Sequence, residues 1–231
     1  MPPTKQHMKN NTSQKLSKNG GPGLLDILNK GPHEPFSYDY GTVRTYYLSD
    51  EIGDPADYID WFHEMRNARD SDVIKININS PGGNLFTAIN FLQVLSETNA
   101  HIIVSVEGAC MSAATLIFLC ADEWELTNNA LFLIHNYSGG AIGKGNEMYS
   151  DIVNKKAWTE KIFRDSYTDF LTEKELEDLG NDKDLWLNTD QVMDRLKTRS
   201  KIREKKHNAA KAKIEKDAKK SIKKVIVEEN L

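Results

Sequence analysis

The chain has 231 residues, of which 39% are hydrophobic, so it can form one domain of ordinary size with extended ends. The net charge of −4 is unevenly spread: residues 201–231 carry 11 Lys or Arg against 5 Asp or Glu, whereas residues 36–200 carry 14 against 27. The acidic body would repel phosphate, which argues against nucleic-acid binding. No apolar run approaches the roughly 18 residues that a membrane span needs. Cys110 and Cys120 have no metal-ligand spacing and are expected to be reduced thiols of a cytoplasmic protein.

Residues 1–35 are rich in Asn, Lys, Ser, Gly and Pro, a composition that predicts a flexible N-terminal arm. Regular structure is expected to begin with a strand at Val43–Leu48 and a helix from Pro55 to about residue 69. Residues 36–200 are therefore predicted to form the folded domain.

Two similar units follow along the chain. Val73–Ile78 predicts a strand, which a Pro-Gly-Gly turn connects to a helix ending near residue 98. His101–Val106 predicts a second strand, which leads into an apolar helix from Ser112 to about residue 121, and a third strand is expected at Ala130–Ile134. Repeated strand–turn–helix units favour an α/β fold with helices packed over a sheet.

A glycine-rich segment, Ser138–Gly145, precedes a helix predicted from about residue 146 to 171. The apolar residues of this helix occupy more than one face, so it is either deeply buried or clamped between its own domain and a neighbouring subunit, and the second reading is favoured. Residues 201–231 form a basic tail in which apolar residues recur every four positions from Ile214, as in a marginal amphipathic helix. A solvated tail and a docking segment both remain open for it.

Ser112 lies where an apolar strand turns into an apolar helix. Free backbone N–H groups and the helix dipole favour developing negative charge there, so Ser112 is a candidate nucleophile. The alternative is that Ser112 only caps the helix. Gly82 and Gly83 follow a strand in the same manner, and a free N–H there could complete an oxyanion hole, although an ordinary turn has the same composition.

His135 follows the third predicted strand, at the kind of strand end where functional residues of α/β sheets gather. Its imidazole could take a proton from Ser112, and a carboxylate could hold its tautomer. Asp184 is the candidate carboxylate. Asp178, Asp182 and Asp190 are its neighbours, and spacing alone does not choose among the four.

Four segments occur in the order found in the Clp protease proteolytic subunit (ClpP) family, which the chain resembles over roughly residues 43–197. The segments are Ile78–Gly83, Gly108–Ala114, Ile134–Asn136 and Asp182–Leu187. Some positions differ from the family pattern: Ala113 replaces a Met, Asn136-Tyr137 replaces Gln-Pro, and Lys183 replaces an Arg. These differences indicate a divergent member, for which a phage origin is one hypothesis.

The resemblance implies a role for each site residue. Ser112 would be the nucleophile, His135 the general base and then acid, and Asp184 the orienting carboxylate. Gly82 and Ala113 would donate the oxyanion hydrogen bonds through their N–H groups. The residues that would contact the bound peptide are Gly83, Asn136, Tyr137 and Gly139.

The resemblance also implies a ClpP/crotonase-like α/β fold of repeated ββα units with a protruding handle helix. The implied activity is serine endopeptidase cleavage of unfolded polypeptides, inside a homo-oligomeric chamber of two stacked heptameric rings. An AAA+ unfoldase ATPase would be the partner, and no metal or organic cofactor is implied. Three alternatives stay open: a capsid-maturation or other ATPase-independent peptidase, a catalytically silent ClpP-like subunit, and an acyl-CoA enzyme of the same fold class.

Overall fold

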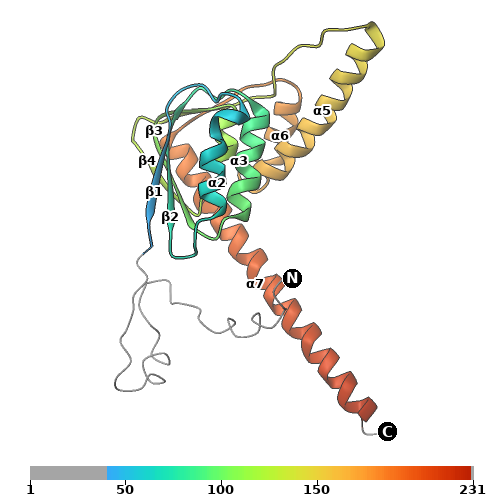
Figure 1. Ribbon diagram of the computed structural model, residues 1–231. Helices are drawn as coiled ribbons and strands as arrows, with labels where there is room; N and C mark the ends of the chain where they lie inside the picture. Colours follow the sequence, from blue (N-terminus) through green and yellow to red (C-terminus); the bar gives the residue numbers. More distant parts are fainter. Residues whose placement is uncertain (1–40, 230–231) are drawn as a thin grey trace, which may run out of the picture.

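The computed structural model describes residues 41–229. The predicted N-terminal arm, residues 1–35, lies outside the described residues. The described chain forms one central sheet with helices against it, and two of the helices project from the body (Figure 1). The predicted α/β class is confirmed.

The sheet contains six strands, with the order β1-β2-β3-β5-β6 and with β4 paired to β3. The pairs β1–β2, β2–β3, β3–β4 and β3–β5 are parallel, and β6 runs antiparallel to β5. Apolar side chains of the central strands, such as Ile76 and Val104, are fully buried. The strand bounds are β1 Val43–Leu48, β2 Val73–Ser80, β3 His101–Met111, β4 Glu123–Leu126, β5 Leu131–Ile134 and β6 Leu185–Asn188.

The first three strands are each followed by a helix, as parallel pairing requires. The α4 segment is buried along its whole length and packs against β2, β3 and β5, while α3 packs against α2 and α4. The bounds are η1 Pro55–Tyr58, α2 Ile59–Arg66, α3 Leu85–Glu97, α4 Ala113–Phe118, α5 Gly145–Tyr167, α6 Glu173–Gly180 and α7 Thr189–Glu229.

In Figure 1, α5 leaves the body towards the upper right and α7 towards the lower right. Apolar side chains remain exposed on α5, where Ile152 is 53% and Val153 46% accessible. The helix α7 begins in the body, where Val192 and Leu196 are buried, and continues without a break past residue 200. The predicted basic tail is therefore the outer part of a longer helix. Among the helices of residues 41–229, none is long and apolar enough to cross a membrane.

Glu175 joins α6 to α7. Its carboxylate accepts hydrogen bonds from Arg195 Nη1 at 2.9 Å and Nη2 at 2.6 Å, and from Thr172 N at 2.8 Å. The guanidinium of Arg195 is the main reason why the pKa of Glu175 falls to about 2. This ion pair fixes the helix that leads directly into the loop carrying Asp182 and Asp184.

Replacing this carboxylate should remove stability in a pH-dependent way. The folded pKa of Glu175 lies below the value of about 4.3 expected in the unfolded chain, so its contribution is complete above that pH and is lost as the pH falls towards 2. Glu175→Gln should lower the free energy of unfolding by roughly 1 kcal/mol at pH 7 and by less at pH 3.

Urea unfolding at both pH values measures this difference. Glu177→Gln, at an exposed position on the same helix, is the matched control and should change little. An equal loss at pH 7 and pH 3 would contradict the assignment.

Candidate active site

A cleft of about 780 Å³ lies where the carboxyl ends of β2, β3 and β5 face the base of α5. In α/β proteins, this end of the strands is where functional side chains gather. Five parts of the chain line the cleft: Gly83–Phe86 after β2, Ser112 with Ala113 and Leu116 of α4, His135–Ala141 after β5, the inner side of α5, and Gly180 with Asp182 after α6. The cleft therefore brings together segments that are far apart in the sequence.

Ser112 occupies a strained turn between β3 and α4, with φ 54° and ψ −129°. Few residues other than glycine adopt such values, and they persist only where the surroundings hold them. The N–H of Ser112 donates to the Leu133 carbonyl at 2.7 Å, and its own carbonyl accepts from the Thr115 N–H at 2.9 Å. The turn leaves Ser112 in the lining of the cleft, directly before the N–H groups of α4.

Gly82 packs against Ser112 so closely that no side chain fits. A Cβ on Gly82, which has φ +97°, would lie 2.5 Å from the Ser112 Cβ and 2.7 Å from the Met111 carbonyl oxygen. The glycine turn and the serine turn are therefore in direct contact, and glycine is required at this position.

The two glycine N–H groups of this turn differ in their partners. Gly82 is buried, and its N–H donates to Ser80 Oγ at 3.1 Å. The N–H that the family resemblance assigns to the oxyanion is thus already engaged. Gly83 is exposed and lines the cleft, and its N–H has no acceptor among the described residues. Gly83 is the better placed donor because Ser80 competes for the proton of Gly82.

The pairing of β5 with β6 brings His135 and Asp184 to the same point of the sheet. The antiparallel ladder ends with Ile134 opposite Leu185, and continuing its register by one residue would set His135 opposite Asp184. Side chains directly opposite each other in such a pair have Cβ atoms roughly 5 Å apart. His135 is half-buried and Asp184 is exposed. Within residues 41–229, no hydrogen bond joins Ser112, His135 and Asp184 to one another.

The other three acidic residues near Asp184 have different surroundings. Asp178 pairs with Lys183 at 2.7 Å, and Asp190 lies in the first turn of α7. Asp182, at φ 59°, accepts a hydrogen bond from Asn136 Nδ2 at 2.7 Å and lines the cleft, whereas Asp184 is not in the lining. Asp182 is therefore held by Asn136, whereas Asp184 is the carboxylate that a continuation of the β5–β6 register would set opposite His135.

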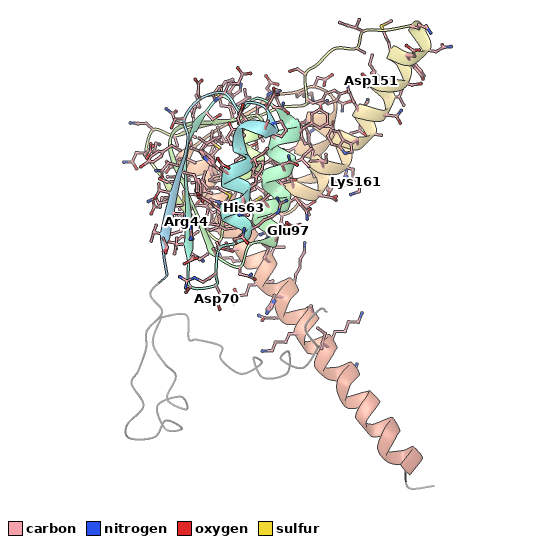
Figure 2. All side chains as sticks on the ribbon, viewed as in Figure 1. Arg44, His63, Asp70, Glu97, Asp151 and Lys161 are labelled. Carbon is pink, nitrogen blue, oxygen red and sulfur yellow. The ribbon has the colours of Figure 1, made fainter. Side chains whose placement is uncertain are left out.

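The cleft also contains the four residues predicted to contact a peptide, namely Gly83, Asn136, Tyr137 and Gly139. Ala113 lines it as well. Of the four histidines in the described residues, only His135 does so. Figure 2 shows His63 on α2, and Asp151 on α5 near the end of that helix farthest from the sheet.

Sequence reasoning missed the contribution of α5 to the cleft. Trp158 packs against Phe86 across the cleft with ring centroids 5.5 Å apart, and Phe163 and Tyr167 continue the same wall. The aromatic spacing of these α5 residues, four or five positions apart, was the available signal. Within residues 41–229, no group of three or more His, Cys, Asp or Glu side chains is arranged to hold a metal ion.

A side chain at position 82 should disrupt this arrangement. Gly82→Ala must displace Ser112 or the turn, because a Cβ there overlaps backbone and Cβ atoms. We expect a loss of roughly 2 kcal/mol or more in the free energy of unfolding, measured by urea denaturation.

Gly145→Ala is the matched control, since a Cβ at Gly145 meets nothing within 4 Å. It should leave stability nearly unchanged. A Gly82→Ala variant as stable as the wild type, with Ser112 in place in its crystal structure, would contradict the close contact.

Comparisons with known proteins bear on the family and the fold. The family model of the Clp protease matches residues 54–195. The ATP-dependent Clp protease proteolytic subunit 2 of Pseudomonas aeruginosa is 29% identical over 142 residues, which cover 59% of this chain and 69% of that protein. A solved structure of a ClpP1 mutant from Listeria monocytogenes superposes with a TM-score of 0.54 at 20% identity, covering 66% of this chain and 86% of the other. The structural likeness shows a shared fold.

Proposed function

The chain belongs to the Clp protease family, and we propose that it is a serine endopeptidase with Ser112, His135 and Asp184 as its triad. The family membership confirms the resemblance found in the sequence, and the family consists of peptidases. The observation that carries the proposal is the meeting of the β3 end, the β5 end and the β6 start at one edge of the sheet, beside a cleft.

The chemistry follows from these positions. The Ser112 hydroxyl attacks the peptide carbonyl while His135 takes its proton, and Asp184 holds the imidazole tautomer. The C–N bond then breaks, the leaving amine receives the proton from His135, and an acyl ester remains on Ser112. Water, deprotonated by His135, hydrolyses this ester and returns the serine to its free form.

The oxyanion hole uses two backbone donors. Ala113 supplies the first N–H at the start of α4, where the four orphan amides of a helix favour negative charge. Gly83 supplies the second, because its N–H has no acceptor in the described chain, while Gly82 keeps the turn pressed against Ser112. In this arrangement Gly82 allows the close packing against Ser112, and Gly83 donates the hydrogen bond to the oxyanion.

Extended peptide binding fits the rest of the cleft. The exposed backbone of Gly83 and of residues 136–139 can pair with a peptide in strand form, as in β-augmentation. The Phe86–Trp158 wall would contact its apolar side chains. The substrate class is therefore polypeptide in an unfolded or extended state.

A homo-oligomeric chamber with a Clp-type ATPase partner is the assembly we propose. Family members form rings that work with such ATPases, and the matched relative is described as ATP-dependent. The exposed apolar side chains of α5, Ile152 and Val153 among them, support a role for this helix in contacts between subunits. Degradation of a folded protein only when a Clp ATPase and ATP are added would separate this assembly from an ATPase-independent peptidase.

The nucleophile assignment has a direct test. Ser112→Ala should abolish peptide hydrolysis and labelling by a fluorophosphonate probe, because both need the hydroxyl, and should leave the oligomeric state unchanged. Ser96→Ala, at an exposed serine on α3, is the control and should retain full activity. Hydrolysis that survives in Ser112→Ala would reject the proposal.

A second test separates the two carboxylates near His135. Asp184→Asn should reduce kcat by about 10⁴-fold, since a neutral amide stabilises the wrong imidazole tautomer. Asp182→Asn should have a much smaller effect, because Asp182 binds Asn136 rather than the histidine. Steady-state kinetics on a short peptide ester provides the comparison, and the reverse order of effects would assign the orienting role to Asp182.

A further inference from the structure

A buried chain of hydroxyl groups connects α5 to the backbone of Ser112. Thr115 Oγ1 lies 2.6 Å from the Ser112 carbonyl oxygen and 2.6 Å from the Tyr167 hydroxyl. Threonine has one hydroxyl proton, and a carbonyl oxygen can only accept. Thr115 therefore donates to Ser112, and Tyr167 donates to Thr115.

The two hydroxyl-bearing residues come from different elements. Thr115 lies in the first turn of α4, and Tyr167 is the last residue of α5. Each is only 1% exposed, so water does not compete for these hydrogen bonds. Burial raises the pKa of Tyr167 well above its usual range, so the phenol keeps the proton that it donates.

The acceptor at the end of this chain is the strained residue of the site. Ser112 has φ 54°, a conformation that costs roughly 1–3 kcal/mol and persists only when its surroundings hold it. Leu133 holds the Ser112 N–H, and the Ser112 carbonyl accepts from both the N–H and the hydroxyl of Thr115. Thr115 thus binds this carbonyl twice, and its hydroxyl is oriented by Tyr167.

We propose that Thr115 and Tyr167 are positioning residues, which hold the Ser112 backbone in the turned conformation that points its hydroxyl into the cleft. This inference rests on the proposed function for its catalytic readout. It also makes the base of α5 part of the structure that orients the nucleophile. A change in how this helix packs would therefore change the backbone conformation of Ser112.

The kinetic test uses variants that remove single hydroxyls. Tyr167→Phe should lower kcat by about tenfold with little change in KM, since one buried hydrogen bond is lost while the ring remains. Thr115→Val should lower kcat by at least the same factor as Tyr167→Phe. Thr115→Ser keeps the hydroxyl and should retain most of the wild-type kcat. The double variant Thr115→Val with Tyr167→Phe should be no worse than Thr115→Val alone.

Tyr47→Phe is the control, because Tyr47 is 62% exposed on β1, away from this chain of hydroxyls. It should leave kcat unchanged. Unchanged kcat in Thr115→Val, or losses that multiply in the double variant, would overturn the proposal. A fall in thermal stability without a fall in kcat would do the same, since it indicates a structural role only.

A crystallographic readout keeps the inference independent of activity. In crystals of Thr115→Val, the Ser112 φ should leave the positive range or the residue should adopt two conformations. Retention of the wild-type φ in both Thr115→Val and Tyr167→Phe would overturn the inference. If the wild type neither cleaves peptides nor reacts with a fluorophosphonate, the proposed function fails, and the crystals still decide whether Thr115 holds the serine.

Discussion

The pairing of β5 with two neighbours of opposite direction is the constraint on which the site depends. Parallel pairing with β3 brings Ser112 to the carboxyl end of β5, and antiparallel pairing with β6 brings Asp184 to the same end. His135, the first residue after β5, therefore lies between them. A slip of one residue in the β5–β6 register would turn the neighbouring side chains to the other face of the sheet. The geometry of the cleft thus follows from hydrogen-bond ladders that are only three and four residues long.

The backbone around Ser112 is held by contacts from three directions. Leu133 fixes its N–H, Thr115 fixes its carbonyl, and Gly82 fills the space against its Cβ. A residue with a strained backbone needs such support, because unrestrained relaxation to an ordinary conformation is favourable. The Ser80 hydroxyl adds a further connection, since it donates to the Asp50 carbonyl at 2.6 Å while accepting from Gly82. The backbone of Ser112 is thus supported by the sheet, the glycine turn and the base of α5.

The two projecting helices present surfaces of different chemistry. The helix α5 carries exposed apolar side chains above a base that is packed into the cleft. The helix α7 is anchored by Val192 and Leu196 and continues into a strongly basic segment, whereas the body is acidic. An isolated helix in water has little stability of its own, so the anchored turns provide the nucleus from which the outer turns extend. Apolar contact is the expected use of α5, and its base also connects to Ser112 through Tyr167 and Thr115.

The sequence by itself determined the α/β class, the main strands and the position of Ser112 at a strand–helix turn, because these depend on local periodicity and on glycine and apolar residues nearby. The sequence pattern did not reveal β4, because polar and apolar residues alternate there over only four positions. It also separated the basic tail from the helix α7, which contains it. Only the tertiary structure showed that Asp182 is bound to Asn136 while Asp184 is not, and that the N–H of Gly82 is engaged while that of Gly83 has no acceptor in residues 41–229. Those differences depend on the β5–β6 register and on the hydroxyl of Ser80, which are interactions across the fold that no spacing along the chain encodes.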